Sequence, residues 1–484
     1  MSATDTDTRH VVVIGAGIAG LAAAHRLLGR GARVTVVEAS DRVGGKLLPG
    51  EIAGVRVDLG AESMLARRPE AVDLAREVGL GDRLRPPATA TASIWTRGAL
   101  RPMPKGHVMG VPGTAAALAG VLSDEGLARI ERDAELPRTE VGDDVAVGEY
   151  VAARLGREVV DRLVEPLLGG VYAGDAYRIS MRSAVPQLYQ AARSHDSLTE
   201  AVREIQAKAA ASGQTGPVFM GVEGGVGRLP LAVARSVTDR GGEILTGTPV
   251  TELRRTAPTG WQVVAGERVL HADAVVVAVP APAAAALLGA ESPAAAAGLR
   301  TVEYASMALV TLAYRRSGAR LPEGSGFLVP PVDGRTIKAS TFASRKWGWI
   351  ADEDPDVLVL RTSVGRHGET EILERDDAHL VDVSRHDLRE ATGLDAEPLR
   401  TLVTRWDDGL PQYPVGHHAR VARIREEVAK LPGLAVCGAQ YDGVGIPACI
   451  ASAYAAVDQL GGDVRGVQEL TANPVQSLHG GAGE

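Results

Sequence analysis

The stretch Val11-Val12-Val13-Ile14-Gly15-Ala16-Gly17-Ile18-Ala19-Gly20 decides the fold, because an apolar run leads directly into three spaced glycines. Gly15 permits a tight turn at the end of a strand, and Gly17 lets backbone amides approach a pyrophosphate. Gly20 allows the following helix to pack closely on the sheet. The N-terminus of that helix would then hold the anion. This order predicts a dinucleotide-binding strand, turn and helix.

The remaining parts of such a unit follow in sequence. A second apolar run, residues 33–37, ends at Glu38, whose carboxylate can accept hydrogen bonds from both hydroxyls of an unphosphorylated ribose. A lone Gly-x-Gly-x-x-Gly is also compatible with an ordinary strand-to-helix turn, but here the helix, second strand and carboxylate are all in place. Arg42, Gly44 and Gly45 come next. They are similar to the FAD-binding extension of flavin oxidases, so FAD is the expected cofactor.

Composition limits the classes of function. The 484 residues are 45% hydrophobic and 23% charged, which is typical of a soluble globular protein with two or three domains. A net charge of −8 argues against a nucleic-acid partner. Cys437 and Cys449 are too few for a disulfide framework and lack metal-ligand spacing. The polar start, residues 1–10, has no apolar core of a signal peptide, so a cytoplasmic protein is expected.

The longest apolar stretch, Ala274 to Ala290, does not predict a membrane span. It is too short, and Pro280 and Pro282 interrupt it, so a buried strand, a turn and a helix are expected. No basic amphipathic stretch stands out elsewhere. Contact with a membrane is therefore expected to be peripheral at most.

Hydrophobic spacing divides the rest of the chain. Apolar residues at three- and four-residue spacing between 103 and 216 predict inserted helices, whereas strand-like runs dominate 301–414. The prediction is an α/β fold, in which a Rossmann-like FAD-binding domain is interleaved with an α+β substrate-binding domain and a helical domain. The FAD-binding domain is assigned residues 1–90, 217–300 and 415–465. The substrate-binding domain is assigned 91–102 and 301–414, the helical domain 103–216, and a flexible tail 466–484.

A second glycine cluster lies near the other end of the chain. Leu434 to Gly438 reads as a strand, and Gly443-Val444-Gly445-Ile446 then opens a helix that continues to Leu460. A helix N-terminus there suits a partial negative charge, such as that of a reduced flavin or of the FAD phosphates. A plain turn is the alternative. Two such clusters in one chain indicate that each supports one end of a long prosthetic group.

Four further segments carry a family resemblance: GAESMLARR at 60–68, EPLLGGVYAGD at 165–175, LPQYPVGH at 410–417 and GVGIP at 443–447. With them, the whole chain resembles the bacterial coproporphyrinogen III and protoporphyrinogen oxidases of the flavin amine-oxidase superfamily. It departs from their pattern at Ala61, where Pro is common, and at Ser452-Ala453, where Ser-Gly is usual.

The resemblance implies an activity. It implies conversion of coproporphyrinogen III to coproporphyrin III in haem biosynthesis, with O2 as acceptor and H2O2 as product, and transient contact with a ferrochelatase. Noncovalent FAD would carry the chemistry at its N5 atom, so no catalytic side chain is assigned. The helical domain would be of the kind called membrane-binding. The site for an amphiphilic macrocycle should be wide, apolar and edged with cations.

The resemblance and the two glycine clusters together assign the site residues. The residues expected at the cofactor are Gly15, Gly17, Ile18, Ala19, Gly20, Glu38, Ala39, Arg42, Gly44, Gly45, Lys46, Gly60, Ala61, Glu62, Ser63, Val250, Gly438, Val444, Gly445 and Ile446. Those expected at the substrate are Arg67, Arg68, Phe327, Ile337 and Thr341.

Some of these assignments have alternatives. Arg67 and Arg68 are a candidate carboxylate clamp or a solvated pair at a helix start. Phe327, Ile337 and Thr341 fit a packed core as well as a substrate wall. The adjacent histidines at 417–418 are expected at the surface or in a loop, with no metal site. Cys437 and Cys449 are expected to be buried apolar residues rather than flavin tethers.

Other functions share part of this pattern. A protoporphyrinogen IX oxidase differs only in its substrate. An amine oxidase or a desaturase shares the cofactor motifs, although an aromatic content of 4% leaves little material for an aromatic cage around an amine. A flavin-free lipid-escort protein of the same fold is the non-enzymatic alternative, and the intact phosphate glycines and Glu38 argue against it.

Overall fold

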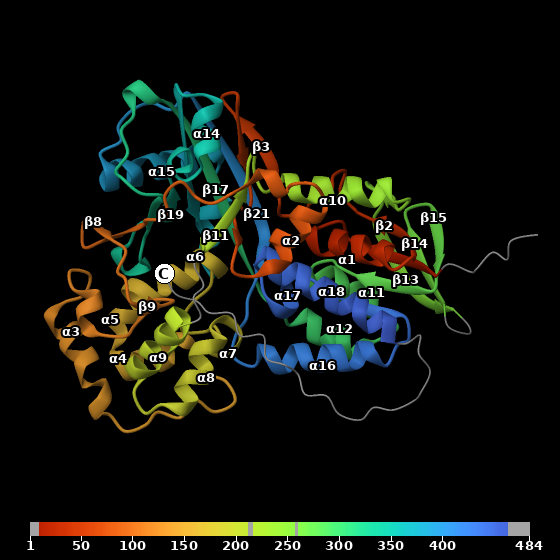
Figure 1. Cartoon of the computed structure of the whole chain (residues 1–484), viewed down its shortest axis with the longest axis horizontal. Coiled ribbons are helices and arrows are strands. Elements are labelled where there is room, and N and C mark those ends of the chain that lie inside the picture. The colour runs from red at the N-terminus through yellow and green to blue at the C-terminus, as the bar shows by residue number, and fades with distance from the viewer. Residues whose placement is uncertain (1–8, 212–215, 257–259, 463–484) are drawn as a thin grey trace, which may run out of the picture.

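The computed structural model of the chain describes residues 9–211, 216–256 and 260–462. The expected flexible tail, 466–484, lies outside these ranges. Figure 1 shows a lobe with a parallel sheet on one side of the molecule. A large, mostly antiparallel sheet and a group of helices occupy the other side.

The parallel sheet has five strands in the order β12-β2-β1-β16-β22. Its strands are β1 (His10–Ile14), β2 (Arg33–Val37), β12 (Glu243–Leu245), β16 (Ala274–Val277) and β22 (Leu434–Val436). They are short apolar runs, because a parallel sheet is covered on both faces. One face carries α1 (Ile18–Gly29), α10 (Arg228–Asp239) and α18 (Ile446–Gly462). The other face carries α11 (Ala281–Leu288), α12 (Pro293–Arg300) and α16 (His417–Ala429).

The strand order brings the two ends of the chain together. Only β16 separates β1 from β22, and the three strands are parallel, so their carboxyl ends share one edge of the sheet about 10 Å apart. Residues of α1 and α18 also pack in one apolar cluster, which includes Ala16, Leu21 and Ile450. The glycine segments that follow β1 and β22 therefore lie on the same side of the lobe (Figure 1).

Smaller elements border this lobe. The antiparallel sheet β13 (Val250–Thr256), β14 (Gly260–Ala265) and β15 (Arg268–Ala272) packs beside it. Other short strands are β3 (Pro49–Ile52), β4 (Val55–Asp58), β5 (Met64–Leu65), β6 (Leu84–Arg85) and β11 (Phe219–Val222). The helix α2 (Pro69–Glu77) follows β5, and α17 (Ala439–Asp442) precedes α18. The predicted strand, turn and helix within 274–290 are confirmed as β16 and α11.

The second large sheet has seven strands in the order β21-β17-β20-β19-β18-β7-β8. Its strands are β7 (Ser93–Thr96), β8 (Ala99–Pro102), β17 (Tyr304–Arg315), β18 (Gly326–Leu328), β19 (Ile337–Thr341), β20 (Val357–Val364) and β21 (Arg400–Pro411). The helix α15 (Asp377–Thr392) packs on one face through Leu380 and Leu388. Two short helices, α13 (Ala343–Lys346) and α14 (Gly348–Glu353), join β19 to β20.

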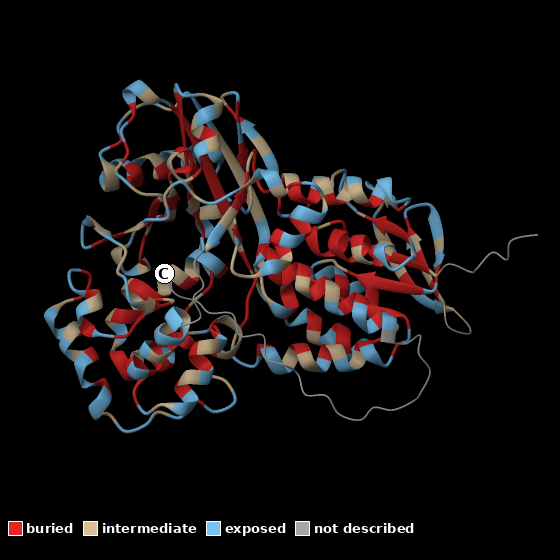
Figure 2. Ribbon diagram, viewed as in Figure 1, coloured by how far each residue is buried: buried red, intermediate tan, exposed pale blue. Residues whose placement is uncertain are grey.

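The two faces of this sheet differ in burial (Figure 2). Residues on the α15 side, such as Val310, Phe327 and Val364, are buried in an apolar cluster. Thr341 and Ser363 alternate with buried neighbours along their strands and remain partly exposed. We call the side that bears Thr341, Arg361 and Ser363 the open face, and it carries the residues considered below.

A group of helices forms the third part. They are α3 (Asp124–Glu131), α4 (Val147–Leu155), α5 (Arg157–Val159), α6 (Glu165–Tyr172), α7 (Met181–Ala184), α8 (Pro186–Ser194) and α9 (Leu198–Ala211). A π-helical segment, residues 160–164, joins α5 to α6. Inside this group, Arg154 and Asp133 form an ion pair with each side chain 1% exposed. Among the described residues, we find no helix that is both long and apolar enough to traverse a bilayer.

The α/β fold class is confirmed. Parallel and antiparallel sheets occur with the helices expected around them, and the chain passes between these parts several times. The predicted strands within 301–414 all form, because their apolar and β-branched residues fit a sheet that is covered by α15 on one face and, along part of β17 and β20, by a second apolar cluster on the other.

Candidate functional site

The turn after β1 has the geometry of a phosphate-binding loop. Gly15 adopts φ +103°, a conformation that L side chains rarely take. A Cβ placed on Gly20 would lie 1.9 Å from the carbonyl oxygen of Gly15, so only glycine lets α1 approach the turn. A Cβ on Gly17 would meet no atom within 4 Å. The loop therefore leaves open space at the position where a ligand is expected.

Backbone amides and one carboxylate line this space. Among the described residues no side chain caps the N-terminus of α1, so amides of its first turn are free for an anion. Glu38 accepts a hydrogen bond from the Ala16 N–H at 2.7 Å through Oε2. Its Oε1 accepts bonds from the Ser40 N–H at 2.9 Å and from the Ser40 hydroxyl at 2.8 Å. Glu38 thus lies beside the glycine turn, as the dinucleotide prediction requires.

The segment after Glu38 folds back onto the same turn. The Gly44 N–H donates to the Ala16 carbonyl at 2.8 Å, and Arg42 donates to the Gly45 carbonyl at 2.9 Å. The Thr248 N–H donates to the carbonyl of Glu38 at 2.8 Å, so the start of β13 also reaches this place. The structure thereby groups many residues expected at the cofactor, namely Gly15, Gly17, Ile18, Ala19, Gly20, Glu38, Ala39, Arg42, Gly44, Gly45 and, through β13, Val250.

The second glycine segment follows β22. Gly438 has φ +135° and Gly443 has φ +153°, so both lie in the region that favours glycine. They flank the short helix α17, and Gly445 and Ile446 then open α18. Val444 packs against the apolar core of the helical group. This segment therefore lies where the parallel sheet meets the helices.

Two aromatic residues hold this segment in place. The Tyr413 hydroxyl donates a hydrogen bond to the carbonyl of Ala439, and the His417 ring contacts the Tyr441 carbonyl through Nε2 at 3.1 Å. The expectation that His417 lies at the surface or in a loop is wrong, because this residue is 2% exposed in the first turn of α16. Desolvation lowers the pKa of His417 to about 4. His418, its neighbour, is exposed as expected.

Both cysteines are buried, as predicted. Cys437 is 0% and Cys449 7% exposed. Burial raises the pKa of the Cys449 thiol to about 11 and raises that of Cys437 further. Thiols with such pKa values are poor nucleophiles at neutral pH. Among the described residues, His, Cys, Asp and Glu side chains form no group of three that could hold a metal ion.

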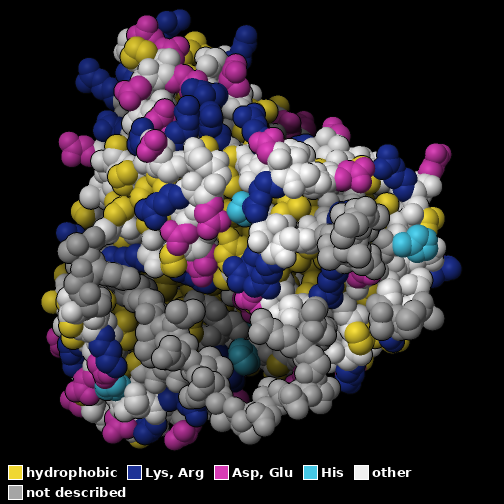
Figure 3. Space-filling view, turned by 45° about the vertical axis from the view of Figure 1, so that its right-hand side comes forward, with side chains coloured by type: hydrophobic (Ala, Val, Ile, Leu, Met, Phe, Trp, Pro, Cys, Tyr) yellow, Lys and Arg dark blue, Asp and Glu magenta, His cyan; other side chains and the backbone are white. Residues whose placement is uncertain are grey.

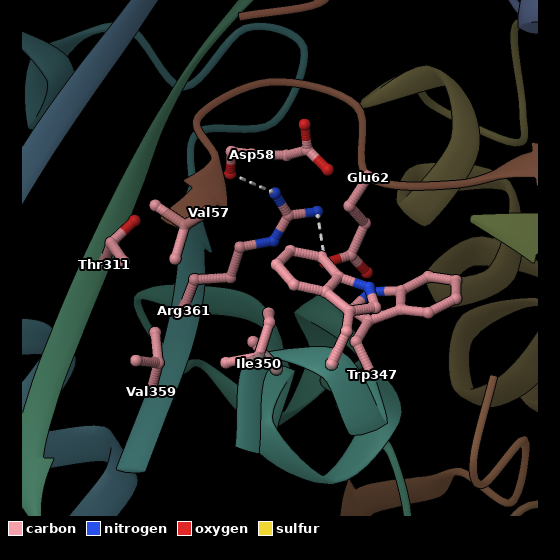
Figure 4. Close-up of a pocket in the computed structure, with 10 residues that line it drawn as sticks. Val57, Asp58, Glu62, Thr311, Trp347, Ile350, Val359 and Arg361 are labelled. Carbon is pink, nitrogen blue, oxygen red and sulfur yellow. Dashed lines mark hydrogen bonds and ion pairs between the residues drawn. The ribbon is translucent and has the colours of Figure 1, made fainter. Parts of the chain in front are cut away.

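The loop at residues 59–63 joins the cofactor side to the second sheet. Glu62, predicted at the cofactor, is 9% exposed, and its carboxylate pairs with Lys346 Nζ at 2.6 Å and with Arg361 Nη2 at 3.2 Å. Figure 4 shows the Arg361 guanidinium between the Glu62 carboxylate and the Asp58 carbonyl. Burial alone would raise the pKa of Glu62, but Arg361 and Lys346 lower it to about 2. The structure places this carboxylate in an ion cluster and leaves Gly60, Ala61 and Ser63 partly exposed.

Lys46 lies on the opposite side of this loop. Its carbonyl accepts a hydrogen bond from the Ala61 N–H at 3.4 Å, and its Nζ lies 5.8 Å from the centroid of the Tyr304 ring. The second sheet thus contributes an aromatic ring beside the predicted cofactor residues.

The residues predicted at the substrate are divided between two environments. Thr341 lies on the open face and is partly exposed. Phe327 and Ile337 are 2% and 0% exposed in the core beneath α15, so the structure supports the core alternative for both. Phe327 contacts the rings of Trp95 and Phe342 edge to face. A bulge between Ile337 and Ala339 puts Ile337 on the core side although it is four residues from Thr341.

The predicted arginine pair lies at the start of α2. Arg68 precedes Pro69 and pairs with Glu70 at 2.7 Å while remaining 43% exposed. The helix that it precedes, α2, packs against α18. The pair is thus partly solvated and precedes a helix that contacts α18, so the clamp and the solvated pair both remain compatible with the structure.

Two cavities among the described residues are smaller than the resemblance implied. The best-defined cavity lies beside Glu62, Arg361 and Trp347, and another lies beside Arg178, His367 and Tyr413. Each leaves about 10 Å³ for the centre of a water molecule, which is space for roughly one water. Neither is the wide apolar chamber that was expected. Acidic and basic side chains are mixed over the part of the surface that is described in the view of Figure 3.

The side chains that bond to the loop at 59–63 were not predicted from the sequence. Arg361, Lys346 and Trp406 lie about 300 residues further along the chain, and no local pattern relates them to Glu62. One signal was available: Arg361 interrupts the apolar run 357–360 in a predicted strand. A charge in a half-buried strand indicates a partner or a functional position.

Comparisons with known proteins agree with this geometry. The model of the flavin-containing amine oxidoreductase family matches residues 18–461. Coproporphyrinogen III oxidase of Mycobacterium tuberculosis is 40% identical over 456 residues, covering 93% of this chain and 96% of that protein. The enzyme of the same name from Bacillus subtilis is 34% identical over 462 residues, covering 93% of this chain and 97% of that protein.

A solved structure supports the same assignment. The crystal structure of "Putative protoporphyrinogen oxidase" from Exiguobacterium sp. 255-15 has a TM-score of 0.83 and 31% identity, covering 94% of this chain and 99% of that chain. The family match begins at Ile18, within the first glycine segment, and includes the loop at 59–63 and the second glycine segment. A flavin is the cofactor that defines the family. The chain therefore belongs to the flavin-containing amine oxidoreductase family.

Proposed function

We propose that this protein is an FAD-dependent oxidase that converts coproporphyrinogen III to coproporphyrin III, with O2 as acceptor and H2O2 as product. One observation carries the proposal: the glycine segments after β1 and β22 lie at one edge of the parallel sheet, and the loop at 59–63 links that side to the open face. The extensive similarity to the coproporphyrinogen III oxidases of M. tuberculosis and B. subtilis supports the choice of substrate.

The residues present fit FAD. The open space at Gly17 and the free amides of α1 suit a pyrophosphate, and Glu38 suits an adenosine ribose. The second glycine segment, from Gly438 to Ile446, would hold the flavin end together with Lys46, Gly60, Ala61 and Ser63. When bound, FAD supplies a hydride acceptor. Noncovalent binding is supported by the buried thiols of Cys437 and Cys449.

The side chains of the protein would orient the substrate. Oxidising a porphyrinogen removes hydride from a bridging carbon, and the pyrrole nitrogens release protons readily, so orientation matters more than an acid or a base. Thr341 and Ser363 on the open face would contact the macrocycle, and Arg68 would bind a carboxylate at its rim. Phe327 and Ile337 would support this wall from behind. The boundaries 1–90, 217–300 and 415–465 remain our proposal for the cofactor-binding part.

The proposal includes a cellular setting. The product of a porphyrinogen oxidase is the substrate of a metal-inserting enzyme, so transient contact with a ferrochelatase in the cytoplasm would suit the reaction. Any contact with a membrane would be peripheral.

Turnover on two substrates tests the proposal. Purified holoprotein is mixed with coproporphyrinogen III or with protoporphyrinogen IX, and porphyrin fluorescence and H2O2 are followed in parallel. We expect a higher kcat/KM for coproporphyrinogen III. Equal or reversed preference would favour a protoporphyrinogen oxidase, the function named for the Exiguobacterium protein. Peroxide formation with amines alone would indicate an amine oxidase, and a colourless inactive protein would indicate a flavin-free escort protein.

A further inference from the structure

The loop at residues 59–63 is held by hydrogen bonds from the second sheet. Arg361 Nη1 donates to the Gly60 carbonyl at 2.8 Å and to the Asp58 carbonyl at 3.3 Å. Trp406 Nε1 donates to the Leu59 carbonyl at 2.9 Å. Three successive carbonyls, those of Asp58 at the end of β4 and of Leu59 and Gly60 in the loop, therefore accept hydrogen bonds from side chains of β20 and β21.

Ion pairs also hold the loop in place. The Glu62 carboxylate is shared by Arg361 and Lys346, whose side chains are only 14% and 17% exposed. Arg361 thus contacts the carbonyl of Gly60 and the carboxylate of Glu62 in the loop, together with the carbonyl of Asp58 just before it. A planar guanidinium can do this because its donors are fixed in a fork, whereas an ammonium cannot.

The surroundings leave the loop little room to shift. A Cβ on Gly60 would lie 2.1 Å from the Lys46 carbonyl oxygen and 3.2 Å from the Trp406 ring. Just before the loop, the Asp58 carboxylate accepts the N–H groups of Val226 and Gly227, each at 2.9 Å. The hydrogen bonds of Arg361 therefore hold a segment whose movement is already restricted on two other sides.

Arg361 itself belongs to the open face. It pairs in register with Thr341 on β19 and with Thr311 on β17. The same side chain therefore contacts the loop expected beside the flavin and stands in the sheet expected beside the substrate.

We infer that Arg361 is a positioning residue, which fixes the flavin relative to the macrocycle by holding the loop at 59–63 against the open face. Glu62 acts with it by orienting the guanidinium and balancing its charge. This inference rests on the proposed function, because it assumes that the loop borders the flavin and that the open face borders the substrate. Geometry of this kind affects the rate strongly, since a misplacement of about 1 Å can cost about 100-fold.

The test compares Arg361→Gln, Arg361→Lys, Glu62→Gln and the double variant Glu62→Gln with Arg361→Gln. Arg56→Gln is the matched control, because Arg56 pairs with Glu353 at 2.6 Å across the same junction but outside the loop. For each holoprotein, kcat, KM, flavin content and the visible flavin spectrum are measured. A melting curve shows whether the variant is folded.

We expect Arg361→Gln to lower kcat by at least about tenfold, to change KM by less than about threefold, and to shift the visible flavin band. Arg361→Lys should recover only part of kcat, and the double variant should be no worse than the poorer single variant, since the two residues act together. If Arg361→Gln does not fold, the kcat and the visible flavin spectrum of Arg361→Lys and Glu62→Gln decide instead.

Other results would overturn the inference. It is wrong if the Arg361 variants keep the wild-type spectrum and kcat, or change no more than Arg56→Gln. A wild-type protein that binds flavin but oxidises no porphyrinogen would overturn the proposed function instead, and the spectral comparison would still decide whether Arg361 positions the flavin. A wild-type protein that binds no flavin would overturn both.

Discussion

The ring of His417 stacks on that of Tyr413, with 4.2 Å between the ring centroids and 19° between the planes. Tyr413 in turn reaches Ala439, so this pair connects α16 to the second glycine segment. A charged imidazole would be costly in this position, which is why the pKa of His417 falls to about 4.

His417 should therefore make stability depend on pH. In the unfolded chain this imidazole takes up a proton near pH 6.5, but in the folded protein only near pH 4, so unfolding becomes more favourable as the pH falls through this window. The loss should reach about 3 kcal/mol at most. Urea unfolding at pH 7 and pH 5 should show this loss in the wild type and in His418→Gln. His417→Phe should lack it, and an unchanged pH dependence in that variant would contradict the assignment.

Two alanine substitutions in the first turn should have separable effects. Gly20→Ala places a methyl group 1.9 Å from a backbone oxygen, so it should destabilise even the flavin-free protein by about 3 kcal/mol or more. Gly17→Ala meets no protein atom within 4 Å, so it should cost about 1 kcal/mol or less in stability but should remove flavin affinity. Unfolding of the apoprotein and flavin titration distinguish the two. Normal flavin binding by Gly17→Ala would contradict the placement of the pyrophosphate.

Glu38→Ala should weaken flavin binding. The carboxylate orders the turn through Ala16 and Ser40, and a charged hydrogen bond to a ligand is worth about 1.5–3 kcal/mol, so affinity should fall at least about tenfold. Flavin fluorescence during dialysis measures the affinity. The control is Glu243→Gln on the adjacent strand β12, where the carboxylate is 54% exposed and pairs with Arg268. Equal losses from both substitutions would argue against a direct role for Glu38.

The two faces of the large sheet should respond differently to substitution. Phe327→Ala removes a ring from the core beneath α15 and should destabilise the protein by about 3–5 kcal/mol. Thr341→Leu on the open face should change stability by less than about 1 kcal/mol. It should lower kcat/KM for the porphyrinogen by crowding the substrate. Steady-state kinetics and chemical unfolding test both, and normal kinetics in Thr341→Leu would place the substrate elsewhere.

Local patterns were enough to predict most of the fold. Short apolar runs such as 11–14 and 274–277 predict buried parallel strands, and glycine spacing after residue 14 predicts the turn, because each depends on a few neighbouring residues. The two glycine clusters also predict supports for one long prosthetic group, and the segments that contain Gly15 and Gly438 follow strands that both flank β16. These features needed no knowledge of distant contacts.

Other features depend on contacts that no local pattern encodes. A bulge after Ile337 changes which residues of β19 face the core, so simple alternation from Thr341 does not reveal that Ile337 is buried beneath α15. His417 is buried because Tyr413 and Tyr441 surround it, and its adjacent partner His418 gave the opposite impression. The ion-pair partner of Glu62, Arg361, lies 299 residues away and could be found only in three dimensions.

The most direct test of the central claim is an anaerobic absorption titration of the purified holoprotein with coproporphyrinogen III. If the two glycine segments hold one FAD beside the open face, the substrate should reduce that flavin without any other reagent. We predict loss of the visible flavin band together with the appearance of coproporphyrin fluorescence, and recovery of the band when air is admitted. A band that stays unchanged while coproporphyrinogen III is present in excess would contradict the account.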